Sequence, residues 1–403
     1  MIDRFERMRV VYAKAVRQAP AVAERFERAG LAPDDLTDEA SLNRLPVLKK
    51  ERLLELQAAE PPFAGFLACD PSELSRIYVS PGPIFEPSLA SDGTGHGMNM
   101  MFASAGVGPG DLALNTWAYH LVPAGLLFDE GLRAVGATVI PSGTGNTELQ
   151  AQLLLTLKPT VFLGSTAYFA ALVEHLEKAG YGLPDTWSLR DVFLGGEFGD
   201  WSAKRRRLEE RFGCRTWSCY ATADFGLIGY EKPSEVGYFI HPERYVQICD
   251  PGTGAPLPAG QAGEIVVTTL ARGWPMIRFG TGDVARAIEI GEDGGVLHLS
   301  ALEGRVGAAV KAREIFIYPG HIEALALRVE GLQEARAAVS RRGDRDEITL
   351  ELLAKDGVDP SPLAGQVKEM FRALTRLKPD HLCWVGAEHE FSIAGRLEDR
   401  KHP

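Results

Sequence analysis

Asp92–Gly97 is a glycine-rich run whose residue types suit the binding of an anion. It reads Asp-Gly-Thr-Gly-His-Gly and leads into an apolar stretch with helical character. Backbone N–H groups at the start of a helix hold phosphates or carboxylates, and glycine allows a ligand to approach the backbone closely. A single run of this kind is a weak signal, so a flexible loop is the favoured interpretation.

The five cysteines do not form a metal-binding or redox motif. They are Cys69, Cys214, Cys219, Cys249 and Cys383, and the nearest pair is five residues apart. Zinc sites and CxxC redox sites need closer pairs. An odd number of scattered cysteines is typical of reduced thiols, so we expect a cytoplasmic protein.

The composition of the 403-residue chain is typical of a globular protein with roughly two or three domains. A net charge of −11 argues against nucleic acid or an anionic membrane as the main partner, because both require clustered Lys and Arg. Met1–Val10 is charged, unlike a signal peptide, and no apolar run approaches the ~20 residues that span a bilayer.

Strands and helices alternate in the first half of the chain. The predicted strands are Leu112–Trp117, Ala137–Pro141, Thr160–Gly164, Asp191–Gly195 and Thr216–Tyr220, with predicted helices at Leu121–Val135, Thr147–Leu157, Thr166–Gly180 and Ser202–Phe212. This alternation predicts a largely parallel α/β sheet, with ligands bound where loops leave the carboxyl ends of the strands. Before it, we expect amphipathic helices over Phe5–Gly30, a strand at Arg76–Ser80 and a turn at Pro81–Pro87.

The pattern changes after Tyr238 to short strands separated by turns. The predicted strands are Tyr245–Asp250, Gly263–Leu270, Met276–Arg278, Val284–Ile290 and Val296–Ser300. They favour an antiparallel β-barrel near residues 240–303, appended to the sheet. The predicted architecture is therefore a large N-terminal α/β domain with this barrel, residues 1–303, and a small α+β C-terminal domain, residues 304–403.

Several motifs occur in a fixed order along the chain. They are Val107–Asp111 with Asn115 and Tyr119, Gly136–Pro141 with Gly145–Glu148, Gly195–Glu197, Cys219–Asp224, Gly263–Thr269, Ile277–Asp283, Gly304–Arg305 and Ile315–Glu323. The series resembles the phenylacetate–CoA ligase branch of the adenylate-forming enzymes and covers about Arg76 to Glu323. Each motif is weak, but their order is a strong signal for the fold.

The resemblance implies a two-step reaction. A carboxylate attacks the α-phosphate of ATP and forms an acyl-adenylate and pyrophosphate; the mobile small domain then rotates, and coenzyme A attacks the adenylate. The implied cofactors are ATP or AMP, Mg²⁺ and coenzyme A, and the implied substrate is a small carboxylic acid. Members of the family are commonly homodimers.

By resemblance, Gly195, Gly196 and Glu197 line the adenine slot, although a plain strand-to-loop turn would look the same. Tyr220 would stack on the adenine or pack in the core. Asp283 would accept hydrogen bonds from both ribose hydroxyls, since a carboxylate has two acceptor oxygens. Its alternative is a turn residue.

Three further roles follow from the resemblance. Arg305 would reach the ribose or phosphates, or else form a surface ion pair. Asp224 stands where the family has a Glu that holds Mg²⁺; a capping or loop role has equal weight. The aromatic residues Tyr119, His120 and Tyr168 would form the acyl pocket, which favours an aromatic acid. Ordinary core packing is the alternative, above all for Tyr168.

The chain departs from the family in its phosphate loop and its tail. In Ser80–Pro87, Pro81 and Pro83 remove N–H donors and Glu86 adds negative charge, so the loop should grip the β and γ phosphates of ATP poorly. The family's C-terminal Lys is matched by Arg396 or by Lys401. Its two hinge Asp residues are Gly307 and Ala308 here.

Two hypotheses of different class remain. The first is an AMP-forming ligase that joins an acid, expected to be aromatic, to coenzyme A. An ATP-independent acyl transferase is a variant that needs no triphosphate grip. The second is a non-catalytic relative that binds a nucleotide or acyl-CoA, which the altered loop and tail would permit.

Overall fold

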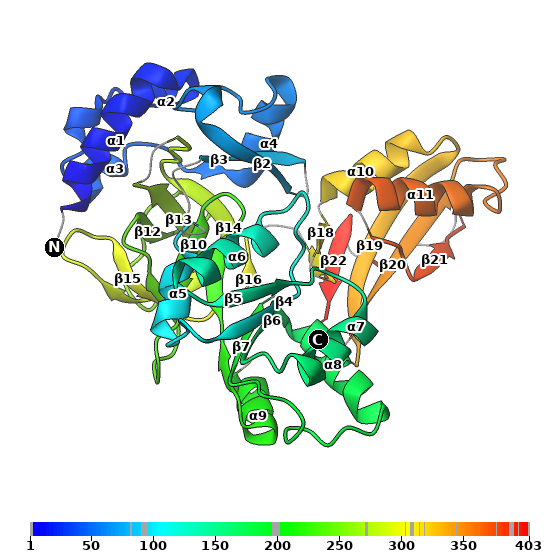
Figure 1. Cartoon of the computed structure of the whole chain (residues 1–403). Coiled ribbons are helices and arrows are strands. Elements are labelled where there is room, and N and C mark those ends of the chain that lie inside the picture. Colours follow the sequence, from blue (N-terminus) through cyan, green and yellow to red (C-terminus); the bar gives the residue numbers. More distant parts are fainter. Residues whose placement is uncertain are drawn as a thin grey trace. The chain divides into compact units, whose positions relative to one another are not determined.

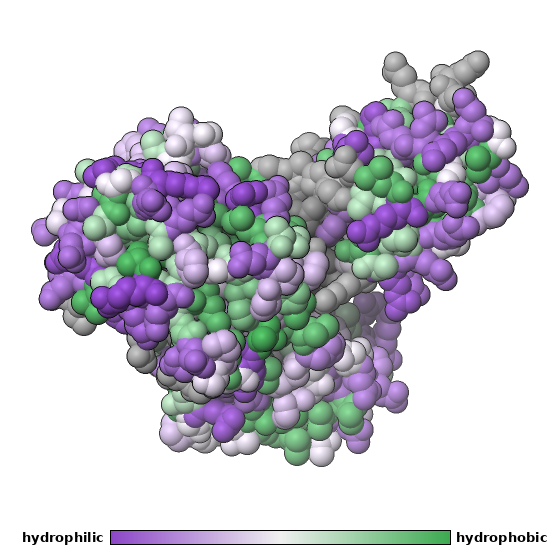
Figure 2. All heavy atoms as spheres, turned by 90° about the horizontal axis from the view of Figure 1, so that it is seen from above, coloured by the Kyte–Doolittle hydropathy of each residue, from purple (hydrophilic) through white to green (hydrophobic). Residues whose placement is uncertain are grey.

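The computed structural model describes residues 3–80, 83–89, 96–195, 202–270, 273–302, 304–306, 310–313, 315–317, 319–343, 345–375, 377–386, 391–393 and 395–401. The chain folds into two compact units, Met1–Gly304 and Arg305–Pro403 (Figure 1). Within the described ranges, no helix has the length and apolar character needed to cross a membrane. Hydrophilic and hydrophobic residues are interspersed over the face in Figure 2.

A parallel sheet of five strands lies in the first unit. Its order is β5 (Thr138–Pro141), β4 (Leu112–Asn115), β6 (Val161–Ser165), β7 (Asp191–Gly195) and β8 (Arg215–Trp217). The connecting helices are α6 (Ala124–Ala134), α7 (Thr147–Thr156), α8 (Thr166–Lys178) and α9 (Ser202–Phe212). Because helices cover both faces, strand residues such as Phe162 and Leu163 are fully buried. The mixed α/β class is confirmed.

The predicted strand Thr216–Tyr220 is wrong as a single element. The chain leaves the parallel sheet at Ser218, and β9 (Cys219–Thr222) joins a different sheet. The backbone N–H of Ser218 donates to Glu231 Oε2 at 2.8 Å instead of continuing a ladder. A buried side-chain acceptor therefore ends one strand and lets the next begin.

A second sheet, here called the mixed sheet, contains nine strands among the described residues. Its path is β12 (Arg244–Cys249), β13 (Ala262–Thr269), β14 (Phe279–Ile290), β15 (Val296–Leu299), β11 (Tyr238–Ile240), β10 (Gly226–Tyr230) and β9, with β1 (Leu48–Lys49) and β16 (Gly304–Arg305) also on β14. The pairing of β1 with β14 is parallel, and those of β12–β13, β13–β14 and β14–β15 are antiparallel.

The predicted strand Met276–Arg278 is wrong, because these residues precede β14. Side-chain hydroxyls bind their backbone: Met276 N donates to Thr269 Oγ1 at 3.0 Å, and Arg278 N donates to Thr268 Oγ1 at 2.9 Å. Arg278 also has a φ of +46°. The apolar run is buried, but its hydrogen bonds are not those of a ladder.

The predicted turn Pro81–Pro87 is wrong over its second half. β2 (Leu74–Ser80) and β3 (Ile84–Leu89) form a hairpin, here called the phosphate-loop hairpin. Ile84, Glu86 and Ser88 alternate on β3 and are all buried. Pro81 and Gly82 lie outside the described residues. The strand is pinned by Gln57, whose side chain binds both the N–H and the carbonyl of Phe85 at 2.9 Å.

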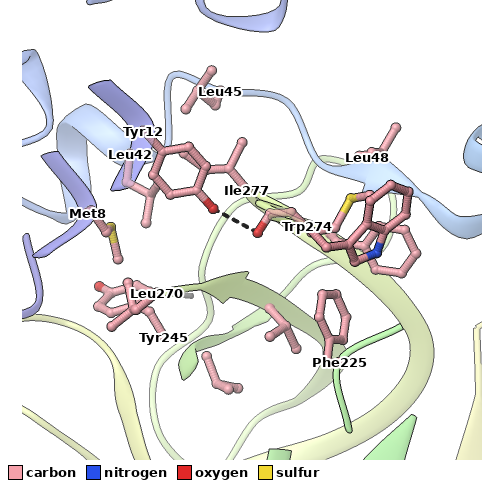
Figure 3. Close-up of a cluster of buried hydrophobic side chains, with 14 of the residues drawn as sticks. Met8, Tyr12, Leu42, Leu45, Leu48, Phe225, Tyr245, Leu270, Trp274 and Ile277 are labelled. Carbon is pink, nitrogen blue, oxygen red and sulfur yellow. Dashed lines mark hydrogen bonds between the residues drawn. The ribbon is translucent and has the colours of Figure 1, made fainter. Parts of the chain in front are cut away.

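The N-terminal helices pack on the mixed sheet. They are α1 (Arg4–Gln18), α2 (Pro20–Arg28), α3 (Glu39–Leu42) and α4 (Lys50–Ala59), and α5 (Met98–Ser104) follows the hairpin. Figure 3 shows Tyr12 of α1 among buried apolar side chains that include Met8, Leu42 and Ile277. The Tyr12 hydroxyl reaches Met276 O at 2.9 Å and Thr269 O at 3.1 Å.

The second unit has its own sheet and core. The strand order is β21 (His381–Trp384), β20 (Arg345–Ala354), β19 (Leu332–Arg342) and β22 (Leu397–Arg400). The helix α10 (Pro319–Arg328) packs against β19 and against α11 (Leu363–Thr375) (Figure 1). A short hairpin pairs β17 (Val310–Ala312) with β18 (Ile315–Ile317).

Tyr12→Phe should lower the free energy of unfolding by about 1–2 kcal/mol, because it removes the buried donor that two carbonyls share. Urea denaturation of the variant and the wild type measures the difference. Tyr181→Phe is the control, since Tyr181 is 45% exposed. Equal stability of the Tyr12 variant and the wild type would contradict the prediction.

Candidate functional site

Tyr119 lies just beyond the carboxyl end of β4 and is held by hydrogen bonds. Asn115 Nδ2 donates to the Tyr119 hydroxyl at 2.8 Å and to Gly125 O at 2.9 Å. The hydroxyl donates to Asp129 Oδ2 at 3.0 Å. Burial, followed by the charge of Asp129, raises the pKa of Tyr119 well above its usual value. Tyr119 is therefore a neutral, fixed hydroxyl at the strand edge.

Tyr168 lies near the end of the neighbouring strand β6. Ser165 caps α8 by accepting from Tyr168 N at 3.1 Å, and the Tyr168 hydroxyl donates to Gln150 Oε1. Burial raises the pKa of this hydroxyl as well. His120 is exposed. β4 and β6 pair, so Tyr119 and Tyr168 share one edge of the parallel sheet.

Gly195 ends β7 at the same edge. An added Cβ would lie 3.1 Å from Trp117 Cζ2, so the aromatic ring approaches the backbone at a point where only a small residue fits comfortably. Gly196 and Glu197, the other two predicted adenine-slot residues, lie outside the described residues.

Tyr220 and Asp283 come together from two strands of the mixed sheet. The Tyr220 hydroxyl on β9 donates to Asp283 Oδ2 on β14 at 3.0 Å. Both side chains are buried, and the Tyr220 ring belongs to the main apolar cluster of this unit. Residues 63 positions apart are thus brought into contact, and the ring position favours a packing role for Tyr220 beside its hydrogen bond.

Asp224 forms an ion pair that the sequence did not reveal. Lys50, the first residue of α4, places Nζ 2.7 Å from Asp224 Oδ2. The two side chains are 16% and 2% exposed, so the pair is largely shielded from water. No short-range pattern links residues 50 and 224, and the partner becomes visible only in the fold.

Glu86 is buried beside this pair. Ser80 Oγ donates to Glu86 Oε2 at 2.9 Å, across the phosphate-loop hairpin. Burial, followed by the charge of Asp224, raises the pKa of Glu86 to about 8, while Lys50 opposes the shift. Among the described residues, Glu86 Oε1 and Asp224 Oδ1 are buried oxygens that have no hydrogen-bond partner. The glutamate therefore lies on the hairpin, as predicted, but its raised pKa reduces the negative charge that it carries.

A small cavity of about 40 Å³ adjoins Asp224. Polar and aromatic side chains contribute to its wall, including Tyr78, His96, Asp224, Arg244, Thr269 and Trp274. His96 Nε2 lies 3.1 Å from Ser88 Oγ. Of the predicted glycine-rich run, Asp92–Gly95 lie outside the described residues. Gly97 has a φ of +92° and precedes α5, where an added Cβ would lie 2.5 Å from His241 Nε2.

The remaining predicted cations lie in the second unit. Arg305 belongs to β16 and is half-buried. Arg396 is exposed, and its carbonyl accepts from Ala337 N at 2.9 Å just before β22. Lys401 Nζ lies 3.3 Å from Asp399 Oδ2. Gly307 and Ala308 lie outside the described residues. Among the residues that the structure describes, no cluster of three or more His, Cys, Asp or Glu has a metal-site arrangement.

Known proteins resemble the chain in both sequence and fold. The family described as AMP-binding enzyme matches residues 124–271. The phenylacetate-coenzyme A ligase of Thermus thermophilus is 28% identical, over 86% of this chain and 80% of that protein. The enzyme of the same name from Escherichia coli is 27% identical, over 87% of this chain and 82% of that protein. The chain is thus similar to phenylacetate-coenzyme A ligases over most of its length, and residues 124–271 match the AMP-binding enzyme family.

A solved structure shares the fold of this chain. A 2-hydroxyisobutyryl-CoA ligase, in complex with 2-HIB-AMP and CoA, aligns with 98% of this chain and 89% of that chain, with a TM-score of 0.89 and 24% identity. The family match contains Tyr168, Tyr220 and Asp224 but ends before Asp283.

Glu86→Gln should stabilise the protein at pH 8 by about 3 kcal/mol more than it does at pH 5. The folded-state pKa, about 8, lies above the ordinary 4.5, so the wild type loses stability as pH rises through this window. Glutamine can still accept from Ser80 and cannot ionise. Chemical denaturation across pH 5–8 measures the trend.

Glu130→Gln is the matched control. It removes a carboxylate that pairs with Arg76 on the phosphate-loop hairpin but is not part of the buried cluster. A pH trend shared by both variants, or absent from Glu86→Gln, would show that ionisation of Glu86 does not cause the loss of stability at higher pH.

Proposed function

We propose that the chain is an AMP-forming enzyme that activates a carboxylic acid as an acyl-adenylate and transfers the acyl group to coenzyme A. The observation that carries the proposal is the contact between Tyr220 and Asp283. It joins the two motifs that resemble the family's nucleoside-binding segments, in a chain that is 28% and 27% identical to two phenylacetate-coenzyme A ligases.

The nucleoside would bind along the edge that these residues define. Asp283 would accept hydrogen bonds from the ribose hydroxyls, and the adenine would lie against Gly195, Gly196 and Glu197. The buried surroundings of Asp283 strengthen hydrogen bonds to a charged acceptor. Arg305 would contact the ribose or phosphate.

The acid would bind between the carboxyl ends of β4 and β6. Tyr119 and Tyr168 present neutral hydroxyls and aromatic rings there, which suits an apolar, aromatic acid. His120 would close the pocket from the solvent side. The likeness to phenylacetate ligases supports this choice of substrate class, because an aryl acid packs favourably against aromatic walls.

In the first step, the acid's carboxylate oxygen forms a bond to the α-phosphorus while the bond to pyrophosphate breaks. In the second step, the thiol of coenzyme A loses its proton and its sulfur forms a bond to the acyl carbon, while the bond from that carbon to the phosphate oxygen breaks and AMP leaves. Positive charge held in place stabilises both transition states. Arg396 or Lys401, on the small domain proposed to be mobile, would supply such charge.

Asp224 would hold Mg²⁺, and its donor set fits in part. Its buried Oδ1 has no hydrogen-bond partner among the described residues, whereas Oδ2 is engaged by Lys50. A carboxylate oxygen of this kind is a ligand that Mg²⁺ prefers. The bound ion would supply charge neutralisation at the phosphates.

The phosphate-loop hairpin favours a second candidate, ATP-independent acyl transfer or nucleotide sensing. The backbone of Ile84–Leu89 pairs with β2, and the Ser80 hydroxyl donates a hydrogen bond to Glu86. Fewer donors are therefore available for the β and γ phosphates. Such a protein would bind AMP or an acyl-adenylate and would not release pyrophosphate.

The purified protein should release pyrophosphate and form a thioester when given Mg·ATP, coenzyme A and an aryl acid from a small panel. Asp283→Ala should lower kcat/KM by roughly 100-fold, because two charge-assisted hydrogen bonds to the ribose are lost. Coupled pyrophosphate detection and chromatography of the thioester measure both steps.

Asp356→Asn is the control, because Asp356 is exposed in the second unit. Micromolar binding of AMP by calorimetry without acid-dependent pyrophosphate release would favour the second candidate. Absence of both AMP binding and turnover would reject the enzyme and the sensor together.

A further inference from the structure

We propose that the ion pair between Lys49 and Glu264 is a positioning device that fixes Asp283 for its ligand. This inference rests on the proposed function, in which Asp283 binds the ribose. Neither Lys49 nor Glu264 is expected to touch the nucleotide. Both act on the backbone that carries the ribose-binding carboxylate.

A bulge in β14 sets the position of Asp283. In the pairing of β13 with β14, Glu264 faces Val284 and Val266 faces Gly280. One residue of β13 therefore lies opposite three residues of β14, Thr281–Asp283. Bulges of this kind lift residues out of the ladder and re-aim their side chains.

The Glu264 carboxylate stabilises this bulge by accepting a hydrogen bond from its backbone. Its side chain is 2% exposed, and Oε1 accepts from Gly282 N at 3.2 Å. Gly282 has a φ of +76°, which favours glycine. At Gly280 an added Cβ would lie 2.4 Å from Glu264 Oε1, so the carboxylate occupies the space that a side chain would need.

Lys49 holds the carboxylate in place. Lys49 Nζ lies 2.5 Å from Glu264 Oε2 and donates to Pro251 O at 3.0 Å. Lys49 belongs to β1, which pairs in parallel with β14 so that Lys49 faces Gly280. The ammonium therefore neutralises a buried carboxylate at the point where the bulge begins, and loss of either partner leaves the other uncompensated.

Hydrogen bonds within the bulge transmit this support to Asp283. Thr281 Oγ1 donates to Ile265 O at 3.0 Å and accepts from Asp283 N at 3.1 Å. Tyr220 then fixes one carboxylate oxygen of Asp283. Glu264 thus holds the residue before Asp283, while Thr281 and Tyr220 hold Asp283 itself.

The segment that carries Lys49 also reaches Asp224. Lys50, the next residue, pairs with that carboxylate at 2.7 Å. Consecutive lysines thus engage carboxylates beside two different segments of the proposed nucleotide site. Lys49 ends β1 and Lys50 begins α4, so the two lysines are held at a fixed separation. This constrains the distance between the segments that carry Glu264 and Asp224.

The test uses the full chain and AMP as the probe. Glu264→Gln should weaken AMP binding about tenfold in calorimetry, because Gly282 and the bulge lose a charged acceptor. Lys49→Met should weaken binding in the same direction and serves as the second variant if Glu264→Gln fails to fold. In turnover assays, the change should appear mainly in KM for ATP, since the adenosine contact is shared by ground and transition states.

The double variant Glu264→Gln/Asp283→Asn separates positioning from a merely structural role. If Glu264 acts through Asp283, the double variant binds AMP as weakly as Asp283→Asn alone. Additive losses would mean that Glu264 affects binding by another route and would overturn the inference. Asp293→Asn is the control, because its ion pair with Arg4 lies at the other end of β14 and should leave AMP affinity unchanged.

The two proposals fail in different ways. If the wild type binds AMP and both Glu264→Gln and Lys49→Met bind it equally well, the positioning role is wrong and the proposed function stands. If the wild type binds no adenine nucleotide or acyl-adenylate, the proposed function is wrong and the positioning role falls with it.

Discussion

Buried negative charge is the constraint on which the first unit depends. Glu86, Asp224, Glu264 and Asp283 are all less than 9% exposed, and an uncompensated carboxylate in such a place costs several kcal/mol. The chain meets this cost in different ways. Lysines pair with Asp224 and Glu264, a tyrosine hydroxyl binds Asp283, and a raised pKa with a serine hydrogen bond accommodates Glu86. The contacts of Asp224, Glu264 and Asp283 join segments that are distant in sequence, whereas Ser80 and Glu86 belong to one hairpin.

The short segment β1–α4 follows from this constraint. Its two lysines point to different carboxylates, and Gln57 at the far end of α4 satisfies the backbone of Phe85 in the phosphate-loop hairpin. One connector therefore links the mixed sheet, the chain around Asp224 and the hairpin. Because all three contacts are polar and at least partly buried, they fix geometry more strictly than apolar packing of the same area would. The connector is a structural component of the candidate site.

The sequence predicted the elements whose periodicity is local. The alternation from Leu112 to Phe212 predicted the parallel sheet and its helices, since buried strands and amphipathic helices have distinct patterns. The prediction failed where a side-chain acceptor replaces a ladder bond, as at Ser218 and at Met276, and where a proline-rich run becomes a strand, as at Ile84–Leu89. The partners of Asp224 and Glu264 could not be predicted either, because they come from residues 50 and 49, far away in the chain.

The altered phosphate loop is best understood through the same balance of charge. A glutamate exposed in a loop would repel phosphate over several ångströms, but Glu86 is on a paired strand, hydrogen-bonded to Ser80 and largely protonated near neutral pH. Its repulsion is therefore weaker than its charge in the sequence suggests. In the described part of the hairpin, Ile84–Leu89 pair with β2, whereas Asp283, the proposed ribose ligand, is held by a separate set of hydrogen bonds. The proposed triphosphate and nucleoside contacts therefore depend on different buried groups, so one can change during divergence while the other persists.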